Sequence, residues 1–190
     1  MFHYRYRSFP ARAITALFVA ALFAAGAAHA GKYTKAAATG GQTIVEGAAR
    51  ADNLKTLVAA VKAAELDGTL SGDGPFTVFA PTDDAFARLP AGTVETLLKP
   101  ENKARLQSIL TYHVVPTQAT AEAVIGLIRD GGGEARVQTV QGGTLTLMLE
   151  GGQRVVVEDE QGNIATVTVA DVMQSNGVVH VIDNVLLPAG

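Results

Sequence analysis

The chain of 190 residues contains no cysteine, which excludes disulfides, thiol catalysis and every zinc site that uses sulfur. It also contains no Asn-x-Ser/Thr acceptor, so N-glycosylation is not expected. A domain of this length can be stabilised by its apolar core without cross-links. We therefore expect the fold to rest on packing alone.

Local catalytic motifs are absent as well. The sequence has no Gly-x-Ser-x-Gly, no His-Glu-x-x-His, no phosphate-binding loop and no dinucleotide fingerprint, the short motifs that carry hydrolytic, metal-dependent or nucleotide chemistry. A hydrolase assembled from scattered carboxylates would leave no such trace. We predict no catalytic residues and no enzyme activity.

The first 30 residues have the three parts of a secretory signal peptide. Arginines at 5, 7 and 12 form the positive region, residues 13–25 the apolar region, and Ala28-His29-Ala30 the cleavage site. The apolar region is too short to span a membrane as a helix. We expect a secreted or periplasmic protein with a signal peptide at 1–30, a flexible leader at 31–41 and one domain at 42–190.

Charge excludes two classes of partner. Cleavage after Ala30 removes three of the 15 basic residues and none of the 18 acidic ones, so the mature chain carries 12 basic and 18 acidic residues. Nucleic acids and anionic lipid surfaces select basic stripes. Neither partner is expected, and no transmembrane segment is expected after cleavage.

The stretch from Phe76 to Pro90, FTVFAPTDDAFARLP, joins a strand pattern to a helix start. Its first half alternates β-forming residues, which predicts a strand packed on both faces. Pro81 ends that strand because it has no N–H to donate. Thr82 is placed to cap a helix whose first turn holds Asp83 and Asp84, where carboxylates complement the positive helix end.

Apolar residues at helical spacing predict further helices that start near Asp52, Thr93, Glu101 and Ala119, with Asp52 or Asn53 as the cap of the first. Beyond the glycines at 131–133, strand-like runs are separated by Gly and Asn turns, at 137–140, 144–149, 154–158, 164–169 and 178–182. Helices first and antiparallel strands afterwards predict an α+β fold with a β-sandwich or barrel-like core.

Three stretches closely resemble the signature segments of fasciclin (FAS1) domains, in the family's order and spacing. They are FTVFAPTDDAF at 76–86, YHVVP at 112–116 and NGVVHVIDNVLLP at 176–188, called below the first, second and third family segments. The resemblance extends from about Ile44 to Pro188. It implies a single-domain secreted bacterial fasciclin-like protein whose fold is a wedge-shaped β-sandwich flanked by several short α-helices.

The resemblance also implies a function, although a fold alone does not determine one. It implies cell adhesion or surface and matrix interaction, with a cell-surface or matrix protein, a glycan or a second copy as partner. No Arg-Gly-Asp is present, so integrin-type recognition is not expected. Some fasciclin-type proteins carry carotenoids, so a carotenoid or lipid carrier is the alternative; otherwise no cofactor is expected.

The polar residues of the family segments are expected to be structural. Two of them, His113 and His180, could ligate a metal as a pair, but no third ligand is signalled nearby, and buried rings are usually bonded to carboxylates or carbonyls. We predict that Asp83 or Asp84 hydrogen-bonds His113. The complete set of structural candidates is Thr82, Asp83, Asp84, Tyr112, His113, Asn176, His180 and Asp183.

Two further features have competing interpretations. The acidic run at 158–160 could hold calcium, but it lacks the alternation of an EF-hand loop, which favours a solvated turn. An apolar ligand or partner surface beside the first helix of the first family segment would use residues that could equally be core. These are Phe79, Phe86, Leu89, Val115, Val124, Leu127 and Ile128.

Overall fold

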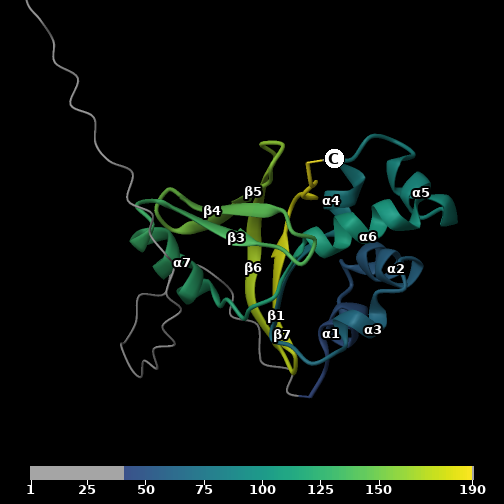
Figure 1. Cartoon of the computed structure of the whole chain (residues 1–190), viewed down its shortest axis with the longest axis horizontal. Helices are drawn as coiled ribbons and strands as arrows, with labels where there is room; N and C mark the ends of the chain where they lie inside the picture. Colours follow the sequence, from purple (N-terminus) through teal and green to yellow (C-terminus); the bar gives the residue numbers. More distant parts are fainter. Residues whose placement is uncertain (1–40, 190) are drawn as a thin grey trace, which may run out of the picture.

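The computed structural model describes residues 41–189. The predicted signal peptide and nearly all of the predicted leader lie outside these residues. The domain combines a seven-stranded sheet with short helices (Figure 1), which confirms the α+β class. The helices are α1 (Ile44–Arg50), α2 (Lys55–Ala63), α3 (Asp67–Leu70), α4 (Asp83–Ala87), α5 (Thr93–Leu97), the 3-10 turn η1 (Pro100–Asn102), α6 (Lys103–Tyr112) and α7 (Ala121–Asp130).

The seven strands follow one another in the sheet in the order β2-β1-β7-β6-β5-β4-β3. Their bounds are β1 (Phe76–Pro81), β2 (Val114–Val115), β3 (Glu134–Gln138), β4 (Thr144–Glu150), β5 (Arg154–Glu158), β6 (Ile164–Gln174) and β7 (Gly177–Ile182). Strands β3, β4 and β5 run across the direction of β1, β6 and β7 (Figure 1). The long strand β6 belongs to both parts, and register shifts interrupt its pairing with β7, as β-bulges that bend a strand do.

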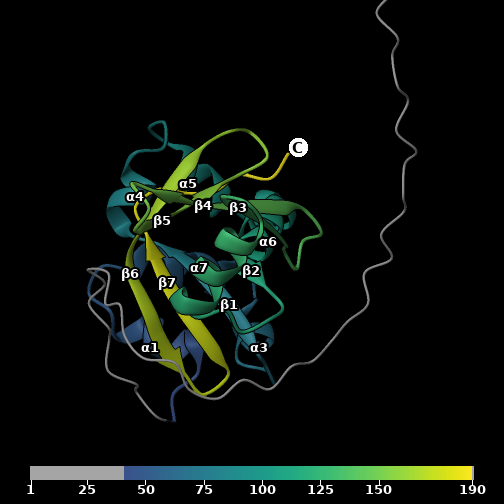
Figure 2. The same cartoon turned by 90° about the vertical axis from the view of Figure 1, so that its left-hand side faces the viewer.

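The centre of the sheet is the parallel pair β1 and β7, in which Phe76 lies opposite Gly177 and Pro81 opposite Ile182. Both strands are buried on both faces, as the sequence predicted for β1. One face of the pair packs against α1 to α6, and the other against α7 and the strands β4 to β6 (Figures 1 and 2). Two apolar cores therefore flank one central pair of strands.

Helix α4 follows β1 directly, as predicted. The Thr82 side chain accepts a hydrogen bond from Ala85 N–H and so caps the helix. Helix α2 differs from the prediction, because its N-cap residue is Leu54 and neither Asp52 nor Asn53 caps it. Strand β3 begins three residues earlier than predicted, and β6 extends five residues further, since its bulges allow pairing to resume beyond Val169.

Candidate functional site

The three family segments meet in the middle of the domain. Strand β1 of the first segment pairs with β7 of the third and with β2 of the second. The carbonyl of His113 accepts a hydrogen bond from Phe79 N–H at 2.9 Å. The segments are far apart in sequence but adjacent in the folded domain, so a polar side chain of one segment can hydrogen-bond to the backbone of another.

His113, in the second family segment, is fully buried and has both ring nitrogens bonded. Nδ1 lies 2.8 Å from the carbonyl oxygen of Ile109, and Nε2 lies 3.1 Å from the N–H of Leu186. A carbonyl can only accept and an N–H can only donate, so the ring is neutral with its proton on Nδ1. Burial, opposed by the bond to Ile109 and the charge of Asp159, lowers the pKa of His113 to about 4. The predicted bond from Asp83 or Asp84 to His113 is wrong.

Asp83 instead bonds to helix α2. Its Oδ1 accepts from Thr56 N–H at 2.7 Å, and its own N–H donates to the carbonyl of Asn53 at 2.9 Å. Burial alone would raise the pKa of Asp83, but the bonds from Thr56 and Lys55 and the charge of Lys55 hold that pKa below its usual value. Asp84, the neighbouring candidate, is exposed.

Tyr112 is fully buried beside the turn that follows β5. Its hydroxyl donates to the carbonyl of Thr144 at 2.9 Å and accepts from Glu160 N–H at 3.1 Å. Burial raises the pKa of the phenol, despite the bond from Glu160. The second family segment thus holds the β5–β6 turn through Tyr112 and the C-terminal segment through His113.

His180 forms the same kind of junction on the other face of the sheet. Its Nε2 lies 2.7 Å from the carbonyl oxygen of Ala119, and its Nδ1 accepts from Asp171 N–H at 3.3 Å. Its ring lies against that of Phe79 at a tilt of 30°, with the centroids 5.7 Å apart. Burial, opposed by the bond to Ala119 and the charge of Asp171, lowers the pKa of His180. The ring therefore ties strand β7 to the loop that precedes α7.

Two residues that the sequence did not single out complete this junction. The Thr77 hydroxyl donates to the carbonyl of Thr117 at 2.6 Å and accepts from Ala119 N–H at 2.8 Å. Asp171 sits at a bulge with φ of 58°, and its carboxylate accepts from Ala121 N–H at 2.8 Å. Left-handed backbone is tolerated by Asp better than by most residues, but a strand pattern gives no signal for it.

Asn176 and Asp183, at the two ends of β7, also bond to backbone. Asn176 accepts from Ile44 N–H at 3.0 Å and donates to the carbonyls of Leu70 and Gly72. Asp183 accepts from Thr166 N–H at 2.7 Å and lies 3.7 Å from the guanidinium of Arg88. Each side chain joins β7 to a segment remote in sequence.

The acidic run at 158–160 is a turn between β5 and β6, as predicted, but its middle residue is not solvated. Asp159 is 5% exposed, and its carboxylate accepts from the N–H groups of Gln161, Asn163 and Leu187 and from the Asn163 amide. These four donors occupy the carboxylate, which serves the turn and the C-terminal segment. In residues 41–189, no group of three or more His, Asp or Glu side chains could hold a metal ion.

The seven residues named for an apolar ligand do not come together. Phe86 and Leu89 belong to the core on the α1 to α6 face, whereas Phe79, Val115, Val124 and Ile128 belong to the core beside α7. Leu127 is 51% exposed on the outer face of α7. The carotenoid or lipid ligand stays a prediction, and these residues do not define a common cavity for it.

An apolar cavity lies on the α1 to α6 face, lined mainly by side chains of α1 and α2. Its volume is about 30 Å³, far below the several hundred Å³ of ordinary ligand pockets. Among the described helices, none has the length and apolarity to cross a bilayer.

Comparison with known proteins agrees with this architecture. Residues 52–188 match the Fasciclin domain family model, and the chain therefore belongs to the Fasciclin domain family. It is 54% identical over 155 residues to protein sll1483 of Synechocystis sp., an alignment that covers 82% of this chain and 78% of that protein. It is 41% identical over 120 residues to the cell surface glycolipoprotein MPB83 of Mycobacterium bovis, covering 63% of this chain and 46% of that one.

The fold also matches a solved structure. The FAS1 domain pair of fasciclin I, described as an insect cell adhesion molecule, superimposes with a TM-score of 0.52 at 26% identity, over 70% of this chain and 44% of that one. The family and fold expected from the three segments are confirmed.

Proposed function

We propose that this chain is a non-enzymatic binding module of the cell surface or extracellular space, which acts in adhesion or in surface and matrix interaction. The observation that carries the proposal is the use made of the polar residues in the family segments. Each of His113, His180 and Tyr112 is buried and bonded to backbone groups of another segment. They build a rigid scaffold, and recognition is left to the outer surface.

The relatives support the same role. Among those aligned, one is a cell surface glycolipoprotein, and the structural relative is a cell adhesion molecule. The signal peptide expected at 1–30 would deliver the chain to that location. The proposal therefore includes a secreted or periplasmic location, because only there can the chain meet a surface partner.

Location can be tested in the organism that encodes the protein. We expect the mature chain, starting at Gly31, in the culture medium, the periplasm or the surface fraction, and we expect accumulation inside the cell when the arginines at 5, 7 and 12 are replaced. N-terminal sequencing of the fractionated protein provides the measurement. A full-length chain in the cytoplasm of the wild type would overturn the proposal.

A further inference from the structure

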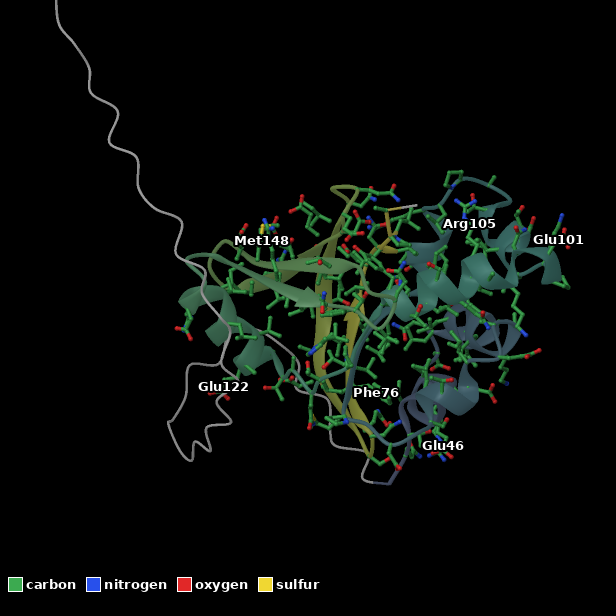
Figure 3. All side chains as sticks on the ribbon, viewed as in Figure 1. Glu46, Phe76, Glu101, Arg105, Glu122 and Met148 are labelled. Carbon is green, nitrogen blue, oxygen red and sulfur yellow. The ribbon has the colours of Figure 1, made fainter. Side chains whose placement is uncertain are left out.

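A polar groove opens where β7 starts, at the end of the molecule where Figure 3 labels Phe76 and Glu46. Its volume is about 540 Å³. Four segments line it, which are Thr43, residues 71–75, Gln118 and residues 174–177. The lining consists of hydroxyls, amides, glycine backbone, one proline and the carboxylate of Asp73, with no Lys or Arg.

The walls of the groove are held in place by hydrogen bonds. The side chain of Asn176 hydrogen-bonds to the backbone of Ile44, Leu70 and Gly72, which fixes the segments on either side of the groove. The N–H and hydroxyl of Ser175 both donate to the carbonyl of Gln42. A groove fixed in this way needs little rearrangement to receive a ligand, which favours binding.

Gln174, in the wall of the groove, has a buried polar atom without a partner. The residue is 9% exposed, and its Oε1 accepts no hydrogen bond within residues 41–189. Buried acceptors are almost always satisfied, because leaving one unpaired is unfavourable. An apolar side chain of similar size would avoid that cost, so the amide has a use that the domain itself does not explain.

Helix α1 is shaped around this amide. A Cβ on Gly47 would lie 2.6 Å from both Oε1 and Nε2 of Gln174, so any side chain at position 47 would displace the amide. Glycine inside a helix is unfavourable relative to alanine. Two unfavourable choices, at Gly47 and at Gln174, therefore keep one amide in place beside the groove.

We propose that the groove binds a neutral saccharide, with Gln174 as a hydrogen-bonding residue. Sugar hydroxyls match a lining of hydroxyls and amides, and they supply the donor that Oε1 lacks once the Gln174 side chain turns its buried amide from Gly47 towards the groove. The absence of a cation from the lining disfavours anionic ligands. Five of the 15 basic residues precede residue 41 whereas all 18 acidic residues follow it, so residues 41–189 carry 10 basic and 18 acidic residues and repel acidic polysaccharides.

A peptide is less well matched to the same groove. A peptide that adds to a sheet needs free backbone donors along an edge. In this wall the N–H of Ser175 is bonded to Gln42, and that of Phe76 to Asn176. This inference rests on the proposed surface-binding function and names the class of partner.

The test is an NMR titration of the mature chain, labelled with nitrogen-15, with the tetrasaccharides of the cello, malto and chito series. We expect at least one of them to shift the backbone amide signals of residues 71–74 and 174–177. A neutral Gly-Ser peptide of similar length is the comparison. The proposal would be overturned if none of the three saccharides shifted these signals, or if only the peptide did.

Variants separate a ligand role from a structural one. Gln174→Met should weaken saccharide binding at least tenfold and leave the melting temperature unchanged or higher, because it removes an unsatisfied buried acceptor. Gly47→Ala should weaken binding by displacing the amide, and Gln118→Ala, at an exposed position, should weaken it without affecting folding. Gly126→Ala, in open space on α7, is the control. Unchanged saccharide affinity in Gln174→Met, Gly47→Ala and Gln118→Ala would overturn the proposal.

The two proposals can fail separately. If the protein binds cell surfaces but the saccharides cause no shifts, the saccharide site is wrong and the surface-binding function stands. If the protein binds neither, the proposed function is wrong as well.

Discussion

The carboxylate of Asp83 accepts a hydrogen bond from the N–H of Thr56 at 2.7 Å, so a residue in the first turn of α4 caps the first turn of α2. An unsatisfied N–H at a helix start is a known cost to stability. We expect Asp83→Ala to lower the free energy of unfolding by about 1–2 kcal/mol, measured by urea denaturation.

Asp84→Ala is the matched control for this substitution. Asp84 lies in the same helical turn but is exposed, so its removal should change the free energy of unfolding by less than about 0.5 kcal/mol. Equal losses in the two variants would show that general helix-end electrostatics, rather than the bond to Thr56, explains the effect.

The two buried histidines make stability depend on pH. Burial holds the pKa of His180 below 6.5 and lowers that of His113 to about 4, so the folded state binds fewer protons than the unfolded state between these values. Their contribution is fully present above pH 6.5 and is lost as the pH falls towards 4. His113 alone should cost about 2 kcal/mol between pH 7.5 and pH 5.

Urea denaturation at pH 7.5, 6 and 5 measures this loss while most carboxylates remain ionised. His113→Gln should be less stable at pH 7.5 but show a shallower dependence on pH, because the titrating group is gone. The same slope in the variant and the wild type would contradict the assignment to His113.

Glycine has opposite roles at positions 177 and 126. A Cβ on Gly177 would lie 2.1 Å from the carbonyl oxygen of Phe76, where the central strands β1 and β7 begin, whereas a Cβ on Gly126 would meet nothing within 4 Å. We expect Gly177→Ala to destabilise the domain by more than about 3 kcal/mol, beyond the range of most single substitutions, or to prevent folding. Gly126→Ala should stabilise it by about 0.5–1 kcal/mol. Thermal denaturation of the two variants should therefore show shifts of opposite sign.

The Tyr112 hydroxyl joins the carbonyl of Thr144 to the N–H of Glu160 inside the domain. Tyr112→Phe leaves both groups without this partner at nearly constant volume, and we expect a loss of about 1–3 kcal/mol. Calorimetry of the variant tests the assignment. Unchanged stability would contradict the assignment.

The sequence was most informative where the physics is local. The strand from Phe76, the Thr82 cap and the apolar face of α6 follow from residue spacing and could be read without the structure. The partner of Asp83 could not, because Thr56 is 27 residues away and a carboxylate at a helix start is satisfied equally well by its own helix. The parallel pairing of β1 with β7 and the bulge at Asp171 also depend on contacts between distant segments.

The site was predicted less completely than the fold. The family segments pointed to His113, His180 and Tyr112, but Thr77 and Gln174 are an ordinary threonine and glutamine in strand patterns. Their importance comes from what surrounds them, namely the carbonyl of Thr117 for Thr77 and the glycine at position 47 for Gln174. No local pattern encodes either neighbour.

The most direct test of the central claim is a binding isotherm of the purified mature protein on intact cells of its own organism that lack the corresponding gene. The account predicts saturable binding of the folded domain. Binding that never saturates, or that does not exceed that of an unrelated acidic protein of similar size, would contradict it.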